Sequence, residues 1–206
     1  MTTQMKRALT VGFGVMTILV VCCLVLHAAV PRGWYLEGTK PADYEVAVGA
    51  EAEYGNYRSV VLQATMPVVK GFGTLMQQFR ADNYLGKRVR FSGGLKADGL
   101  QDWAGLWMRV NKGNLVVAFD NMQGRALKGT HDWKDYEVVL DVPRDATDIS
   151  FGVLLQGSGS VWLRHPKFET VEHSVPTTGS VNFPQQMRQT SNFPFPEGPE
   201  NLNFEN

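Results

Sequence analysis

The feature that most constrains this chain is a succession of short apolar runs that stop at Gly, Asn, Asp or Pro. Within these runs apolar and polar residues alternate, and scarcely any stretch of ten residues has the periodicity of a helix beyond Pro31. The expected strands are 44–48, 59–65, 71–79, 87–96, 104–110, 115–121, 136–142, 149–155, 160–163 and 167–171. Ten short strands predict an all-β fold, an antiparallel β-sandwich of jelly-roll type.

Alternation also assigns the faces of several strands. Val89 and Phe91 are expected to point into the sandwich, whereas Arg88 and Arg90 face water. Residues 111–114, Asn-Lys-Gly-Asn, lie between two runs, and Gly and Asn tolerate the positive φ of a tight turn. This pattern is typical of antiparallel strands that are covered on one side.

The first thirty residues have a different character. Residues 8–30 contain no charged side chain, and a helix of that length would be roughly 34 Å long, enough to cross a bilayer. Lys6 and Arg7 precede this segment, so we expect residues 1–7 in the cytoplasm and the bulk outside. The alternative is a secretory signal that is cleaved, although a small-x-small site is lacking before residue 30.

Composition supports this division. The net charge of zero combines a positive N-terminus with residues 31–206, whose 18 basic and 20 acidic side chains give a net charge of −2. Such a balance argues against a nucleic-acid partner. The two cysteines, Cys22 and Cys23, both lie in the apolar segment, so residues 31–206 can form no disulfide and offer no thiolate to a metal.

The C-terminal residues change character again. Residues 174–200 are rich in Pro, Ser, Thr, Gln and Asn and are expected to form a linker rather than a second domain. Residues 201–206 regain alternation, with Leu202 and Phe204 on one side. The predicted organisation is therefore a membrane segment at 8–30, a sandwich at 31–173, the linker, and a strand-like segment at 201–206.

Several motifs resemble those of a family of bacterial hypothetical proteins and of domains appended to transcriptional regulators. They are GFGTLMQQF (71–79), NYLGKRVRFSG (83–93), DWAGLWMRV (102–110), AFDNMQ (118–123), KGTHDW (128–133), YEVVLDVP (136–143), ISFGVLLQGSG (149–159) and VWLRHPKFE (161–169). The wider pattern is similar to the galactose-binding-like jelly roll of carbohydrate-binding modules. The resemblance implies an extracytoplasmic, single-pass protein of the bacterial inner membrane, or a secreted one if the signal is cleaved.

The chain departs from this resemblance in two places. Related domains begin with an N-L-x-F-E strand ahead of the Gly-Trp-Tyr segment, whereas here the matching residues 201–205 come last. We therefore expect this segment to return as an edge strand, to its own domain or, by self-association, to a neighbouring copy. Related jelly rolls also place acidic residues where this chain has Arg164 and His165, which argues against a structural calcium ion.

Enzyme motifs are lacking, and neither a cofactor nor a metal is expected. The only catalytic alternative is a glycan-active hydrolase, which needs two carboxyl groups roughly 5 to 9.5 Å apart. Two pairs of acidic residues are close enough in sequence, Asp98 with Asp102 and Asp132 with Asp135. Acidic residues beside loops ordinarily cap turns or face water, so we do not expect catalysis.

A ligand-binding face is the remaining interpretation. Trp107 and Arg109 share the face opposite Leu106 and Met108, and an indole beside planar hydrogen-bonding groups suits a sugar ring. The predicted ligand-binding residues are Trp107, Arg109, Asp120, Asn121, Gln123, Arg125 and Trp133. The same residues could instead serve packing and turns. We expect a membrane-anchored binding module for carbohydrate or cell-envelope glycan; the alternative is a protein-interaction module of the envelope.

Overall fold

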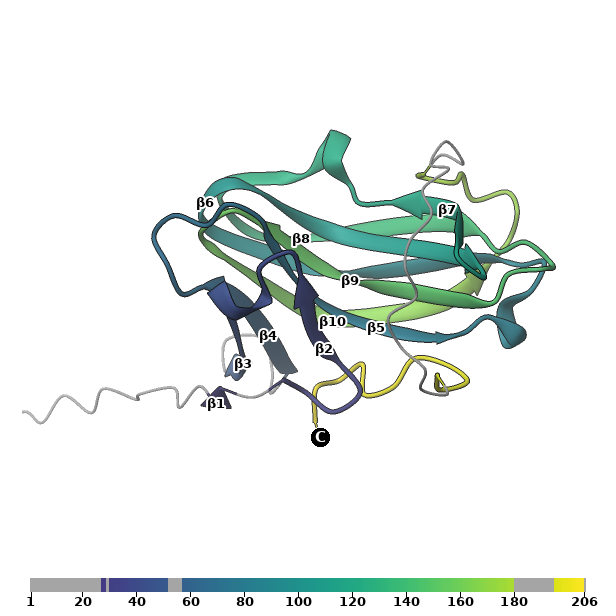
Figure 1. The fold of residues 1–206 in the computed structure, drawn as a ribbon, viewed down its shortest axis with the longest axis horizontal. Coiled ribbons are helices and arrows are strands. Elements are labelled where there is room, and N and C mark those ends of the chain that lie inside the picture. Colours follow the sequence, from purple (N-terminus) through teal and green to yellow (C-terminus); the bar gives the residue numbers. More distant parts are fainter. Residues whose placement is uncertain (1–26, 29, 52–56, 180–194, 206) are drawn as a thin grey trace, which may run out of the picture.

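The computed structural model describes residues 27–28, 30–51, 57–179 and 195–205 (Figure 1). Within them the regular elements are antiparallel strands and single-turn 3-10 helices. The strands are β1 His27–Ala28, β2 Tyr35–Gly38, β3 Tyr44–Glu51, β4 Tyr57–Ala64, β5 Phe72–Arg80, β6 Arg88–Lys112, β7 Leu115–Asp120, β8 Leu127–Asp141, β9 Asp148–Gln156 and β10 Ser160–Val171. The 3-10 helices are η1 Pro41–Asp43, η3 Asp82–Tyr84 and η4 Gln123–Arg125.

These strands form two layers that share β6. Layer A consists of β3, β4, β10, the first half of β6, and β8, with β1 paired to the edge strand β3. Layer B consists of β2, β5, β9, the second half of β6, and β7. The all-β antiparallel sandwich expected from the sequence is confirmed (Figure 1).

The crossing of β6 between the layers differs from the prediction of two separate strands at 87–96 and 104–110. The register with β8 shifts at several points between Leu95 and Ala104, and Gly99 adopts a φ of 61°. The chain bends there without losing its ladder, because bulges let one strand turn from one layer to the other. In the same way β10 unites the predicted strands 160–163 and 167–171 through a bulge after Arg164.

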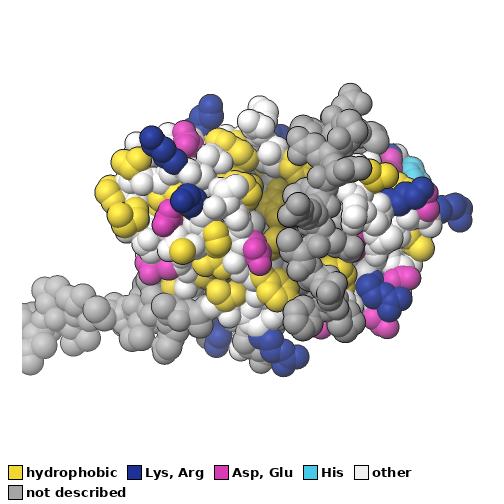
Figure 2. Space-filling model, in the orientation of Figure 1, with side chains coloured by type: hydrophobic (Ala, Val, Ile, Leu, Met, Phe, Trp, Pro, Cys, Tyr) yellow, Lys and Arg dark blue, Asp and Glu magenta, His cyan; other side chains and the backbone are white. Residues whose placement is uncertain are grey.

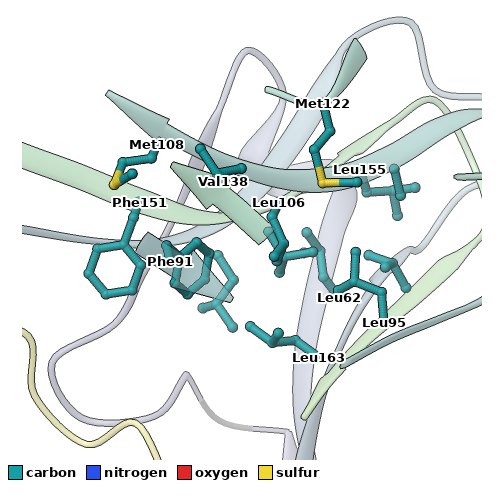
Figure 3. Close-up of a cluster of buried hydrophobic side chains, with 14 of the residues drawn as sticks. Leu62, Phe91, Leu95, Leu106, Met108, Met122, Val138, Phe151, Leu155 and Leu163 are labelled. Carbon is teal, nitrogen blue, oxygen red and sulfur yellow. The ribbon is translucent and has the colours of Figure 1, made fainter. Parts of the chain in front are cut away.

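The core lies between the two layers and is apolar. Phe91 of layer A and Phe151 of layer B meet edge to face with ring centroids 4.6 Å apart. Figure 3 labels other members of this cluster: Leu62, Leu95, Leu106, Met108, Met122, Val138, Leu155 and Leu163. Val89 and Phe91 are fully buried while Arg88 and Arg90 reach the surface, as the alternation predicts. Period-two patterning therefore assigns the inner and outer faces of β6 at Val89 and Phe91 correctly.

The C-terminal segment, residues 195–205, docks on its own domain, but the expected edge strand does not form. Asn201 and Phe204 adopt positive φ values of 46° and 56°, which break an extended run. Phe204 is 1% exposed and packs against Trp34, with ring centroids 5.4 Å apart. Trp34 donates from Nε1 to the carbonyl of Asn201, and Gln77 hydrogen-bonds both backbone groups of Glu200. The segment thus joins the core through the side chain of Phe204 instead of adding a strand to the sheet.

The predicted membrane segment lies almost entirely outside the described residues. Its last part is described: His27 and Ala28 pair with Val48 and Ala47 of β3, so these two residues belong to layer A rather than to a continuous span. Among the residues of the ranges given above, the structure contains no helix long and apolar enough to cross a membrane. The first part of the linker predicted at 174–200 lies beside β8. There Thr178 donates its backbone N–H to the carbonyl of Val139.

Candidate functional site

The outer face of layer B is the side of that sheet turned away from the core. Leu106 and Met108 of β6 are fully buried in the core, so Trp107 and Arg109 lie on the outer face. The register continues this face onto β9 and β5, where Trp107 aligns with Gly152 and then with Met76. A row of side chains from three strands therefore surrounds Trp107.

Two buried glycines adjoin Trp107 on this face. Gly105 lies between Trp103 and Trp107 on the outer side of β6, and Gly152 lies beside Trp107 on β9. The space over Gly105 is filled by Met122, whose Cβ would lie 3.1 Å from a Cβ there. At Gly152 the lack of a side chain leaves room for a large ring to lie flat on the strands.

Trp107 occupies that room. Its Nε1 donates to Oγ1 of Thr74 at 2.7 Å, and this hydroxyl donates in turn to the carbonyl of Val153. Since β9 lies between β6 and β5, the indole extends across β9. Trp107 is only 6% exposed, so it forms the floor of the face and is not the freely presented ring that the sequence predicts.

A buried polar cluster adjoins Trp107. Asp148 is 1% exposed and accepts hydrogen bonds from Nδ2 of Asn111, Nε2 of Gln78 and Oγ1 of Thr147, at 2.6 to 2.7 Å. Arg109 contacts Ser150 Oγ at 3.4 Å and lies with its guanidinium 6.0 Å from the Trp107 ring centroid. Burial lowers the pKa of Arg109, and the nearby charge of Asp148 opposes this effect. The cluster fixes planar polar groups beside an aromatic floor.

The predicted residues of the η4 turn serve its local structure. Asp120 accepts a hydrogen bond from the backbone N–H of Met122 at 2.8 Å and pairs with Arg125 at 2.8 Å. Asn121 accepts one from the backbone N–H of Gln123 through its side-chain oxygen. Arg125 also donates to the carbonyl of Glu137, which ties the turn to β8. These are the turn roles that the sequence left open beside a ligand role.

Trp133 lies on the other side of the sandwich. Its ring is stacked under the guanidinium of Arg164, whose Cζ is 4.3 Å from the ring centroid. Arg164 belongs to β10 and Trp133 to β8, both strands of layer A. Trp133 therefore cannot share one site with Trp107.

Of the seven predicted residues, the structure brings together Trp107 and Arg109, with Asn121 at their margin. The backbone oxygen of Asn121 lies 3.4 Å from where a Cβ on Gly105 would be. Two further aromatic residues of the outer face escaped the sequence prediction: Tyr35, which is 51% exposed, and Trp103, which is half-buried. Trp103 lies four residues before Trp107 on the same strand, so alternation places both on the same face. Tyr35 belongs to β2, which is not among the strands predicted from the sequence.

The acidic residues considered for catalysis have local partners. Asp98 accepts a hydrogen bond from Thr130, and Asp132 accepts one from the backbone N–H of Trp133. Within the described part of the chain, the His, Cys, Asp and Glu side chains form no group of three or more that could hold a metal ion.

Comparisons with known proteins place this chain beside one curated sequence. An uncharacterised HTH-type transcriptional regulator of Bacillus subtilis (strain 168), YbfP, is 43% identical over 176 residues. The match takes in 84% of this chain and 57% of the relative, so the chain spans little more than half of the relative's length. No family model matches the sequence.

Two solved structures are similar to this chain at low sequence identity. The enzymatically active domain of tailspike protein 4 from bacteriophage CBA120 has a TM-score of 0.53 and 16% identity, over 68% of this chain and 20% of the phage protein. A xylan-binding CBM22-1 domain of Paenibacillus barcinonensis Xyn10C has a TM-score of 0.48 and 14% identity, over 72% of this chain and 94% of the domain. At such identities the likeness concerns architecture, and function must be argued from the site.

Proposed function

We propose that the protein is a non-catalytic binding module and that the outer face of layer B binds carbohydrate. The observation that carries the proposal is the aromatic floor made by Trp107 beside the fixed polar groups of Arg109 and Gln78. Two further aromatic rings of this face, Tyr35 and Trp103, can stack on the apolar C–H face of a sugar. The combination of rings and fixed polar groups on one face of the sheet is the composition expected of a ligand site.

The polar groups of this face suit hydroxyl ligands. Gln78 and Arg109 lie in one register row, joined through Ser150 of β9. Amide and guanidinium groups can each form more than one planar hydrogen bond, as vicinal hydroxyls require. Trp107 supports the face from below, so we assign stacking to Trp103 and Tyr35. The space-filling view shows hydrophobic side chains gathered among charged ones in the orientation of Figure 1 (Figure 2).

A binding experiment on matched tryptophan variants tests the proposal. Isothermal titration with a panel of soluble polysaccharides identifies a ligand for the wild type, and Trp103→Ala is expected to weaken its binding about fivefold, since a lost aromatic contact is worth on the order of 1 kcal/mol. Trp162→Ala, a half-buried tryptophan of layer A, is the control and is expected to bind normally.

Two results would contradict this assignment. Equal weakening by both variants would mean that the effect is not local to layer B, and a lack of binding across a broad panel would remove carbohydrate as the ligand. Circular dichroism of each variant shows whether the fold is retained, so that a loss of binding can be attributed to the face.

The proposal extends to location. The uncharged segment 8–30, preceded by Lys6 and Arg7, supports anchoring in the inner membrane with the sandwich on the extracytoplasmic side. The part of it that precedes His27 would be roughly 28 Å long as a helix, close to the thickness of the hydrocarbon core, and His27 and Ala28 then pair with β3. Retention in the membrane pellet after alkaline extraction is expected; release into the supernatant would contradict an anchor. A glycan ligand is accessible on that side of the membrane.

A further inference from the structure

A cavity lies between β10 and the C-terminal segment, and none of its lining residues belongs to the outer face of layer B. It has a volume of about 470 Å³ and is lined by Arg58, His165, Pro166, Lys167, Leu202, Asn203 and Glu205. A volume of this order is typical of sites for small ligands. Three parts of the chain that are remote in sequence form its wall, so the cavity exists only when the C-terminal segment is docked.

The wall on the β10 side is a bulge with an unusual backbone. The register with β6 shifts between Arg164 and Lys167, and His165 adopts a φ of 48°. Gly93 of β6 leaves room for this bulge, because a Cβ there would lie 2.7 Å from Leu163 Cδ1 and 3.5 Å from Pro166 Cα. Bulges redirect side chains out of the regular ladder. Here the redirected residues line the cavity.

The charge of the wall is mainly positive. Arg58 and Lys167 carry permanent positive charges, against one carboxylate, Glu205. Across the described parts of the chain, neither Arg58 nor Lys167 forms an ion pair, whereas Arg88 and Arg90 of the same layer both do. A cationic wall with apolar contributions from Pro166 and Leu202 suits an anion attached to a small organic body.

Arg58 connects the cavity to the C-terminal segment. Its NH1 donates to the carbonyl of Phe204 at 3.2 Å, while the same side chain lines the cavity. Leu202, Asn203 and Glu205 form the opposite wall. A ligand that binds only the docked arrangement must stabilise docking by the free energy of its own binding.

We propose that this cavity binds a ligand bearing a carboxylate or phosphate group, and that its binding strengthens docking of the C-terminal segment. The site is independent of the carbohydrate face, because it shares no residue with the outer face of layer B. The expected ligand is about the size of a monosaccharide carrying one oxyanion, such as a uronic acid or a sugar phosphate.

Titration of the full chain with glucuronate, glucose 6-phosphate and neutral glucose tests the proposal. Saturable binding of at least one of the two anions, absent for glucose and weaker at high salt, is expected. Lys167→Gln should weaken it about tenfold, because a charge-assisted hydrogen bond is lost, while Lys40→Gln, remote from the cavity, should bind as wild type. The docking bond to the Phe204 carbonyl comes from Arg58, so the loss of Lys167 does not remove it.

The coupling has its own readout. The ligand is expected to slow hydrogen exchange at the amides of Phe204 and Glu205 in the wild type and to have no such effect in Lys167→Gln. Preference for one anion over the other identifies the oxyanion. Equal binding of glucose, unchanged binding in Lys167→Gln, or lack of saturation at millimolar anion would overturn the site; binding with unchanged exchange at Phe204 would overturn the coupling.

Discussion

The outer faces of the two layers arise from the same period-two alternation, yet they bury their polar groups to very different extents. On layer A, Arg88 pairs with Asp141 and Arg90 with Glu169, each at 2.7 Å, and the two carboxylates are about half exposed. On layer B, Asp148 is 1% exposed and is surrounded by neutral donors. Exposed ion pairs contribute little to stability, whereas a buried carboxylate depends on every hydrogen bond. Layer A therefore has the character of a solvent face and layer B that of an organised site.

The C-terminal segment sharpens this difference, because it holds layer B more extensively than layer A. Gln77 and Arg80 of β5 bond Glu200 and Pro196, whereas layer A contributes the bond from Arg58. Phe204→Ala is expected to lower the free energy of unfolding by about 3–5 kcal/mol in urea denaturation, since a fully buried aromatic ring is lost.

Hydrogen exchange shows where that effect falls. In Phe204→Ala, amides of β2 and β5 should lose more protection than those of the central part of β10. Asn203→Ala, an exposed neighbour, is the control and should leave both unchanged. A loss below 1 kcal/mol, or equal loss of protection in both layers, would show that the segment does not favour layer B.

Asp148 gives the next largest expected effect. Asp148→Asn replaces a carboxylate that accepts three hydrogen bonds with an amide that must present a donor to donors. A loss of about 2–3 kcal/mol in urea denaturation is expected, because buried groups lose their partners. The matched change on layer A, Glu169→Gln, should cost less than about 1 kcal/mol. If the two losses were equal, the distinction between the faces would fail.

The strands and their faces could be predicted from the sequence because alternation is a local signal. Val89 and Phe91 lie in the core as the pattern requires, and each predicted strand overlaps an observed one. The joining of two predicted strands into β6 could not be predicted, since bulges near Gly99 are set by packing of both layers. The docking of residues 195–205 through turns likewise depends on Trp34, far away in sequence.

The candidate site could be predicted only in part. The alternation of residues along β6 is enough to place Trp107 and Arg109 on one face. Their interaction partners, Thr74 for Trp107 and Asp148 for Arg109, belong to other strands. The sequence prediction groups Trp133 with Trp107 and Arg109 as a further ligand-binding residue, whereas the fold places β8 in layer A. Spatial grouping across strands requires the register, and one sequence gives no direct measure of it.

The smallest expected effect concerns pH and the face of layer A. Arg88 bonds both carboxylate oxygens of Asp141 and holds the pKa of that carboxyl below its usual 3.8. A lowered folded-state pKa stabilises the fold above the unfolded value and loses this contribution as pH falls through the folded value. Asp141→Asn should therefore cost about 0.5 kcal/mol near pH 7, and the difference in melting temperature from wild type should shrink as the pH falls below 3.8 and through the lowered folded-state pKa. Glu172→Gln, on an exposed residue beyond β10, should show no such convergence. A difference that persists unchanged at low pH would mean that Asp141 acts through packing rather than charge, and that layer A's outer face is less like a solvent face than its ion pairs indicate.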